Sequence, residues 1–190
     1  MITGNVSRIT TRLSWDDLVL DKATLKKIFT IKDWLKQPTS STSGDESKGL
    51  YKAGYKVLFT GPATTQKGLS AALLGKEFQQ AVYGIDLSKV VSKYIGETEK
   101  NLEKVFSRAE NKNWILFFDE ADALFGKRTN VKDSHDRFAS TEVSYLLQRM
   151  ENYQGLTILA TNIKGSIDDA FIRRFQLVVR FPPLSTSLKE

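Results

Sequence analysis

The sequence contains no cysteine and only one histidine. Without cysteine the chain has no disulfide scaffold, no thiolate metal site and no cysteine nucleophile, and its composition fits a reducing compartment. No apolar run approaches the roughly 18 residues of a membrane-spanning helix, and residues 1–5 are not a basic stretch followed by an apolar one. We therefore expect a cytoplasmic protein with no membrane partner.

The charge of the chain is mixed along its length. The formal net charge is +6, but lysines and arginines are interspersed with acids instead of forming blocks. This distribution argues against nucleic acid as a partner, and a DNA-handling function rests on the net charge and little else. The single histidine, His135, has no partner visible in the sequence, and we expect it at the surface.

The pattern of apolar residues predicts the fold class. At 190 residues, with 41% hydrophobic residues, the chain suits one domain. Strand-like apolar runs lie at 55–60, 82–85, 115–118, 156–160 and 177–181, and helical patterns lie at 25–35, 69–73, 102–109 and 143–150. This alternation predicts an α/β fold in three layers (αβα), with a parallel sheet of five core strands and helices on both faces.

We expect a single domain over residues 1–190, in three parts. Residues 1–50 hold a linker, an amphipathic helix and a flexible loop rich in serine and threonine, residues 51–183 form the core, and residues 184–190 are a tail. The lysines of the amphipathic helix are expected to face solvent; they are Lys22, Lys26, Lys32 and Lys36.

Two adjacent acids follow the apolar run at 115–118. In an open α/β sheet, ligands lie beyond the carboxyl end of the strands, so Asp119 and Glu120 would face a ligand. Phosphate chemistry needs one carboxylate to hold Mg²⁺, directly or through water, and a second to activate the attacking water. Asp119 suits the first task and Glu120 the second. The alternative is a strand that ends in polar turn residues.

A glycine- and threonine-containing segment connects the run at 55–60 to the next helical pattern. The segment occupies the position of a phosphate-binding loop, whose pattern is Gly, four residues, Gly, Lys, then Ser or Thr. Its candidate cofactor-binding residues are Gly61, Pro62, Ala63, Thr64, Thr65, Gln66, Lys67, Gly68 and Leu69. Lys67 would reach the β and γ phosphates. The alternative is a plain strand-turn-helix connection.

Two positions of this loop depart from the pattern. Gln66 stands at the second glycine, where a positive φ would cost its side chain roughly 1–2 kcal/mol and where that side chain can enter the phosphate space. Gly68 replaces the hydroxyl that binds Mg²⁺. Ser70 lies roughly 200° further around the helix and cannot readily supply that hydroxyl.

Taken together, the motifs resemble those of the AAA+ ATPase family, in the group that contains katanin, spastin and related protein-remodelling ATPases. The resemblance covers residues 14–183 and is to the large α/β subdomain, a P-loop NTPase-type fold. Residues 57–69 match a degenerate Walker A motif and 115–122 an intact Walker B motif. The small helical lid that the family carries after residue 183 is expected to be absent.

The resemblance also implies roles for polar residues near the end of the chain. Asn162, at the end of a sensor-1-like strand (156–162), would position the water or γ-phosphate; the alternative is a turn residue. Arg173 and Arg174 fall where the family places arginine fingers; the alternative is a basic pair that contacts surface acids. Arg137, within 132–138, resembles the opening of the same homology region.

The segment 93–96 resembles pore loop 1 of the family. Tyr94 and Ile95 would then project into the channel of a ring and grip an extended polypeptide, with Gly96 allowing the turn. The alternative is an aromatic side chain that closes the core at a strand-helix junction.

The resemblance thus implies an ATPase that uses ATP or ADP with Mg²⁺, remodels polypeptide substrates and forms a homo-oligomeric ring, a hexamer in the full-length protein. Because of Gln66 and Gly68, we expect its activity to be impaired. The alternative is a non-hydrolysing structural or regulatory protein with the same fold.

Overall fold

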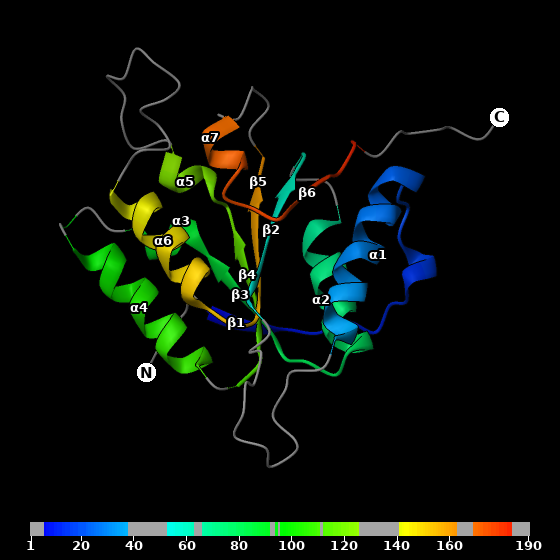
Figure 1. Ribbon diagram of the computed structural model, residues 1–190, viewed down its shortest axis with the longest axis horizontal. Helices are drawn as coiled ribbons and strands as arrows, with labels where there is room; N and C mark the ends of the chain where they lie inside the picture. Colours follow the sequence, from blue (N-terminus) through cyan, green and yellow to red (C-terminus); the bar gives the residue numbers. More distant parts are fainter. Residues whose placement is uncertain are drawn as a thin grey trace, which may run out of the picture.

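A six-stranded sheet lies between two layers of helices in the computed structural model, which describes residues 6–37, 53–62, 66–91, 94, 96–110, 112–125, 141–162 and 169–183 (Figure 1). The strands are β1 (Val6–Ile9), β2 (Tyr55–Thr60), β3 (Val82–Asp86), β4 (Ile115–Asp119), β5 (Leu156–Thr161) and β6 (Leu177–Arg180). The helices are η1 (Trp15–Asp17, 3-10), α1 (Lys22–Lys36), α2 (Lys67–Glu77), α3 (Leu87–Val90), α4 (Glu97–Ala109), α5 (Asp122–Phe125), α6 (Thr141–Asn152) and α7 (Asp169–Ile172).

The sheet has the order β1-β3-β4-β5-β2-β6, and its five strands other than β1 run parallel to one another. This confirms the predicted α/β class and the five parallel core strands. A sixth strand, β1, extends the sheet by pairing antiparallel to β3, with Val6 opposite Ile85. The sequence did not reveal β1 because its four residues, VSRI, form no apolar run and lie half-buried or exposed at the sheet edge.

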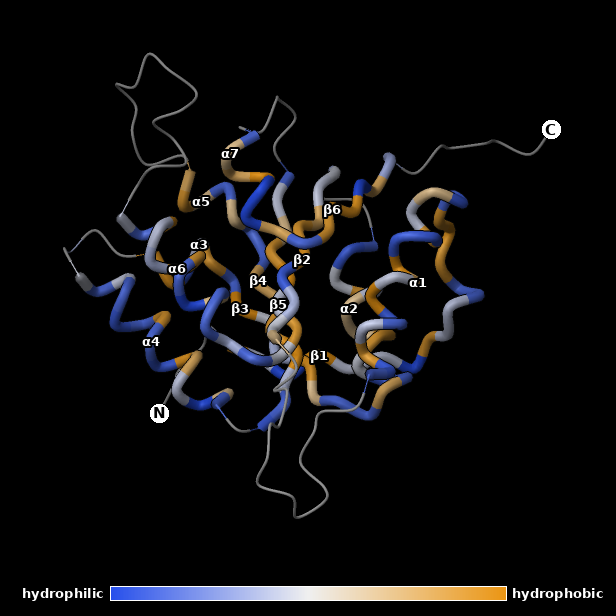
Figure 2. The backbone as a smooth tube through the Cα atoms, viewed as in Figure 1, coloured by the Kyte–Doolittle hydropathy of each residue, from blue (hydrophilic) through white to orange (hydrophobic). Residues whose placement is uncertain are grey.

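Side chains alternate between two cores along the central strands. On β2, Val57 and Phe59 pack toward α1 and α2, whereas Leu58 packs toward α4 and α6. On β4, Phe117 packs on the side of α1 and α2, and Phe118 packs on the side of α4 and α6. Because both faces are covered, successive residues at the centres of these strands are apolar, as in VLF of β2 and ILFF of β4. In Figure 2 the solvent-facing helix α4 is coloured mostly hydrophilic.

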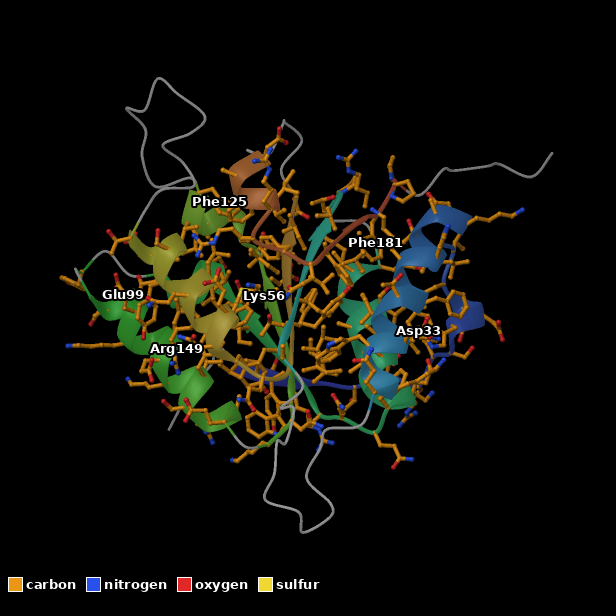
Figure 3. All side chains as sticks on the ribbon, viewed as in Figure 1. Asp33, Lys56, Glu99, Phe125, Arg149 and Phe181 are labelled. Atoms are coloured by element: carbon orange, nitrogen blue, oxygen red, sulfur yellow. The ribbon has the colours of Figure 1, made fainter. Side chains whose placement is uncertain are left out.

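Helices α4 and α6 are joined by polar contacts across their outer faces. The Tyr145 hydroxyl donates to Glu103 at 2.6 Å, and Arg149 Nη2 donates to the same carboxylate at 3.3 Å. Arg149 is labelled on this side of the molecule in Figure 3. This network lies on the opposite side of the sheet from α2 (Figure 1).

The N-terminal helix is fixed to α2 by a buried lysine. Lys32 pairs with Glu77 at 2.7 Å, and the Trp15 indole N–H donates to the same carboxylate at 2.7 Å. Lys32 is therefore buried, and the expectation that all the lysines of this helix face solvent was wrong for that residue. A lysine can lie on an inner face when a carboxylate from a distant segment meets it.

The carboxyl ends of the parallel strands lie side by side along the upper side of the sheet in Figure 1, where α5 and α7 also lie. This row of strand ends is called the carboxyl edge of the sheet. Within the described part of the chain, no helix has both the length and the apolar character that crossing a bilayer requires.

Candidate functional site

The loop after β2 begins with a turn that only glycine adopts readily. Gly61 has a φ of +142°, and a Cβ at this position would lie 2.2 Å from the carbonyl oxygen of Phe181. The Gly61 N–H donates to the Thr161 carbonyl at 3.3 Å, and the Phe181 N–H donates to the Thr60 carbonyl at 2.7 Å. These contacts hold the start of the loop against the ends of β5 and β6.

Gln66 begins α2 without the strain that a left-handed conformation would impose. Its φ is −91° and its ψ is 36°, so the steric cost considered for a positive φ does not arise. Its side-chain oxygen accepts a hydrogen bond from the Val19 N–H at 3.1 Å. Gln66 therefore ties the segment between η1 and α1 to the start of α2.

The start of α2 offers no hydroxyl at position 68. The Ser70 hydroxyl donates to the Gln66 carbonyl at 2.9 Å within the helix, and Ser70 is fully buried, as expected for a residue that does not replace the missing hydroxyl. A Cβ added at Gly68 would lie 3.7 Å from the Phe117 ring, which is ordinary van der Waals contact. The fold therefore leaves room for a first side-chain carbon there.

Lys67 lies almost completely buried, and three oxygens accept from its ammonium group. Nζ donates to the Gly61 carbonyl at 2.9 Å, to the Thr161 carbonyl at 3.0 Å and to Asn162 Oδ1 at 2.5 Å. An ammonium has three N–H donors, so all of them are used within the protein. Burial lowers the pKa of Lys67, and the nearby charges of Asp119, Asp122 and Glu120 oppose this shift.

Asp119 and Glu120 lie at the end of β4 on the same sheet edge. Asp119 Oδ1 accepts from the Glu120 N–H at 2.9 Å. Glu120 has a φ of 56°, a left-handed conformation that costs a non-glycine residue roughly 1–2 kcal/mol. Burial raises the pKa of Glu120, and the carboxylates of Asp119, Asp122 and Asp86 raise it further.

Asp122, to which the sequence analysis gave no separate role, contacts the end of β5. The Thr161 hydroxyl donates to Asp122 Oδ1, and the Asn162 N–H donates to Asp122 Oδ2 at 3.0 Å. The only signal in the sequence was its position as the last acid of the run at 115–122. The structure therefore brings Lys67 and Asn162 into contact, within electrostatic range of Asp119, Glu120 and Asp122.

A magnesium ion bound with a nucleotide would find one side-chain ligand here. Among the described residues, no group of three or more His, Cys, Asp or Glu side chains is arranged to hold a metal. Asp119, at the end of β4, is the carboxylate that the sequence predicts for the task, and Mg²⁺ commonly uses one or two carboxylates together with substrate phosphates and water. The donor set therefore fits Mg²⁺ held mainly by the nucleotide.

Within the described residues, neither Arg173 nor Arg174 forms a hydrogen bond or ion pair with Lys67, Asp119, Glu120 or Asn162. Arg174 Nε and Nη2 donate to Glu151 Oε1 at 3.1 and 2.9 Å, so this residue contacts a surface acid of its own chain. Arg173 is exposed, and within the described ranges its guanidinium has no hydrogen bond or ion pair.

Tyr94 is 74% exposed, so its side chain does not close the hydrophobic core. The neighbouring Gly96 has a φ of +77°, which favours glycine. Four other predicted site residues lie outside the described residues; they are Ala63, Thr64, Thr65 and Ile95. His135, expected at the surface, and Arg137, expected to open the second homology region, also lie outside them.

Comparisons with known proteins identify relatives of this chain. The family model described as "ATPase family associated with various cellular activities (AAA)" matches residues 57–183. An AAA family ATPase of Sinorhizobium fredii, y4kL, is 32% identical over 93% of this chain and 52% of its own length. The peroxisomal ATPase PEX6 of Saccharomyces cerevisiae is 32% identical over 85% of this chain and 16% of its own.

Solved structures agree with these sequence relatives. A crystal structure of the FIGL-1 AAA domain in complex with ADP matches with a TM-score of 0.65 and 25% identity, covering 95% of this chain and 59% of that one.

A third sequence relative, vacuolar protein sorting-associated protein 4B of Mus musculus, is 34% identical over 66% of this chain and 29% of its own length. The chain thus spans about half the length of y4kL and smaller shares of the longer relatives.

Proposed function

This chain belongs to the family of ATPases associated with various cellular activities (AAA). We propose that it binds ATP with Mg²⁺ and hydrolyses the bond between the β- and γ-phosphates, releasing ADP and phosphate. Gln66 and Gly68 lower this activity. The observation that carries the proposal is the contact between Lys67 and Asn162 beside the acids that follow β4. A buried cation beside acids and a polar amide suits phosphoryl transfer, because these groups can neutralise phosphate charge and orient the attacking water.

Lys67 would bind the β and γ phosphates by exchanging its present acceptors for phosphate oxygens. The carbonyls of Gly61 and Thr161 and the oxygen of Asn162 now satisfy its donors, so binding costs the loss of those bonds. Mg²⁺ held through Asp119 would neutralise charge on the same phosphates. This exchange is one reason to expect modest nucleotide affinity.

Asn162 presents its amide group in a defined orientation. Lysine has only donors, so the atom of Asn162 that meets Lys67 is the oxygen. The amide NH₂ group is then available to donate to a phosphoryl oxygen or to the attacking water. Such a donor stabilises charge that develops in the transition state. When Lys67 releases the oxygen, the bond from the Asn162 N–H to Asp122 still holds the backbone of this residue in place.

Glu120 would accept a proton from the attacking water. Its raised pKa makes the carboxylate a stronger base than an ordinary glutamate. The left-handed backbone at Glu120 is the kind of local strain that functional sites retain.

We also propose that the chain acts in the cytoplasm within a homo-oligomeric ring, a hexamer in the full-length protein, that moves polypeptide substrates. The exposed side chain of Tyr94 supports a role in gripping a substrate, together with Ile95. The exposed guanidinium of Arg173 can reach a neighbouring subunit, whereas Arg174 would first have to leave Glu151.

A second candidate function is a non-hydrolysing module that regulates or supports other AAA subunits. The satisfied donors of Lys67 and the missing hydroxyl at Gly68 favour this alternative. Both features oppose productive Mg²⁺ and ATP binding, whichever function is correct.

The test is steady-state ATP turnover by the full chain and by Glu120→Gln. We expect wild-type turnover that falls at least about 100-fold in the variant, because a positioned general base contributes 10²–10⁴-fold. Glu103→Gln, which changes a carboxylate in the α4–α6 network, is the matched control and should retain turnover. Equal turnover in wild type and Glu120→Gln would contradict the proposed role of Glu120.

A further inference from the structure

Asp122 uses both oxygens of its carboxylate to hold one neighbouring strand end. Oδ1 accepts from the Thr161 hydroxyl, and Oδ2 accepts from the Asn162 N–H at 3.0 Å. Thr161 is buried, so this contact is largely shielded from water. Hydrogen bonds to a charged acceptor are stronger than those between neutral groups.

This contact lies where the strand pairing on that side of β5 ends. The register of β4 with β5 stops at Phe118 opposite Leu159. One further backbone bond, from the Ala121 N–H to the Ala160 carbonyl at 3.1 Å, continues the contact. Beyond that bond, Asp122 supplies the link between the chain after β4 and the last residues of β5.

Asn162 is consequently held from two sides. Asp122 fixes its backbone N–H, and Lys67 fixes its side-chain oxygen at 2.5 Å. Both the position of the backbone and the rotation of the amide are then determined before a ligand binds. A group that is already ordered loses little conformational entropy when it meets its partner.

We propose that Asp122 is a positioning residue, which sets the end of β5 so that the Asn162 amide meets the terminal phosphate of ATP and distinguishes ATP from ADP. This inference rests on the proposed function, because it assigns the amide a phosphate to meet. Asp122 itself acts through Thr161 and Asn162, since both of its oxygens are engaged by those residues.

Two substitutions separate position from charge. In Asp122→Asn, the amide oxygen can accept from the Asn162 N–H, and the new NH₂ group can donate to the Thr161 hydroxyl, because a hydroxyl also accepts. Asp122→Ala removes both contacts. The affinities of the full chain for ADP and for a non-hydrolysable ATP analogue, each with Mg²⁺, are measured by calorimetry.

Wild type and Asp122→Asn should prefer the ATP analogue over ADP by the same ratio, to within about threefold. Asp122→Ala should lower that ratio about tenfold, the effect of one lost hydrogen bond to a charged group, while ADP affinity changes about threefold or less. Glu103→Ala, which breaks the α4–α6 network, is the control for a general loss of stability and should retain the ratio. If Asp122→Ala kept the wild-type ratio, the proposal would be overturned. It would also be overturned if Asp122→Asn lowered the ratio as much as Asp122→Ala does, because the charge of Asp122, and not its hydrogen bonds, would then be responsible.

Hydrogen exchange of the Asn162 backbone amide, followed by nuclear magnetic resonance without nucleotide, tests the positioning separately. We expect protection in wild type and Asp122→Asn and exchange at least about tenfold faster in Asp122→Ala, because the opened amide loses its partner. Equal exchange in wild type and Asp122→Ala would overturn the positioning role. A failure of the wild-type chain to bind any nucleotide would instead overturn the proposed function and leave the exchange result to decide the role of Asp122 in the fold.

Discussion

The ammonium of Lys67 donates to the side-chain oxygen of Asn162 at 2.5 Å, although the two residues are 95 positions apart in the chain. The contact joins the start of α2 to the end of β5. Lys67 would have to share or release this acceptor when a phosphate binds, so the same contact both assembles the site and competes with its ligand.

Replacement of Lys67 by methionine should weaken ATP binding. Loss of one charged donor to phosphate costs about 1.5–3 kcal/mol, or roughly 10- to 150-fold in affinity. Calorimetry on the full chain measures the effect. Lys76→Met on the same helix is the matched control, because exposed Lys76 donates to backbone carbonyls of the N-terminal segment. Equal affinity in wild type and Lys67→Met would place the phosphates elsewhere.

Restoration of a hydroxyl in the loop should raise Mg²⁺-dependent affinity. Gly68→Thr supplies a candidate Mg²⁺ ligand, and a side-chain carbon fits beside Phe117 at 3.7 Å. We expect at least about a tenfold gain, equivalent to roughly one hydrogen bond to a charged group. Gly68→Val, which has a similar shape without the hydroxyl, is the control. The same gain in both variants would show that packing, not metal coordination, is responsible.

Removal of the Gln66 side chain tests the other departure of this loop from the phosphate-binding pattern. Gln66→Ala breaks the bond to the Val19 N–H at 3.1 Å and frees the segment between η1 and α1. We expect this link to restrict access to the loop, so affinity for ATP and for ADP should rise together in the variant, by about threefold or more, since one exposed hydrogen bond contributes about 0.5–1.5 kcal/mol. Calorimetry with both nucleotides gives the measurement; unchanged affinity for both would exclude a restricting role.

The stability of the fold should respond to pH through Glu120. The pKa of this carboxyl is raised in the folded chain, so the folded state binds more protons than the unfolded state between the two pKa values. The free energy of unfolding therefore falls as pH rises through this window. Glu120→Gln should melt at a higher temperature than wild type at neutral pH, and the difference should shrink as pH falls below the ordinary range of a glutamate carboxyl. A difference that is independent of pH would contradict the shift.

Two glycines of the loop should respond in opposite directions to alanine. Gly61→Ala places a carbon 2.2 Å from the Phe181 carbonyl oxygen at a φ of +142°, and it should cost more than about 2 kcal/mol in the free energy of unfolding. Gly68→Ala lies within α2 and should stabilise the chain by up to about 1 kcal/mol, because alanine favours helix. Chemical denaturation measures both. A similar change in the two variants would contradict the described loop.

The elements that sequence patterns predicted are those whose cause is local. The unbroken apolar run of β4 and the acids that follow it are visible in eight consecutive residues, and their position at the carboxyl edge follows from parallel pairing. The exposure of Tyr94 was likewise implied by the pore-loop resemblance, whereas its alternative as a core residue was wrong.

The features that the sequence did not predict depend on contacts between distant segments. Lys32 is buried because Glu77 meets it, and Gln66 avoids strain while its side chain reaches Val19. Strand β1 forms by pairing with the side of β3 that does not face β4. The role of Asp122 required the position of Thr161, 39 residues away. Periodicity cannot reveal these relationships, because each needs the tertiary arrangement of two elements.

The most direct test of the central claim is a crystal structure of the full chain with Mg²⁺ and a non-hydrolysable ATP analogue at saturating concentration. We expect the terminal phosphates between Lys67 and Asn162, within hydrogen-bonding distance of Lys67 Nζ, and Mg²⁺ on the side of Asp119. A nucleotide bound elsewhere, or Lys67 that keeps all three present acceptors and contacts no phosphate, would contradict it.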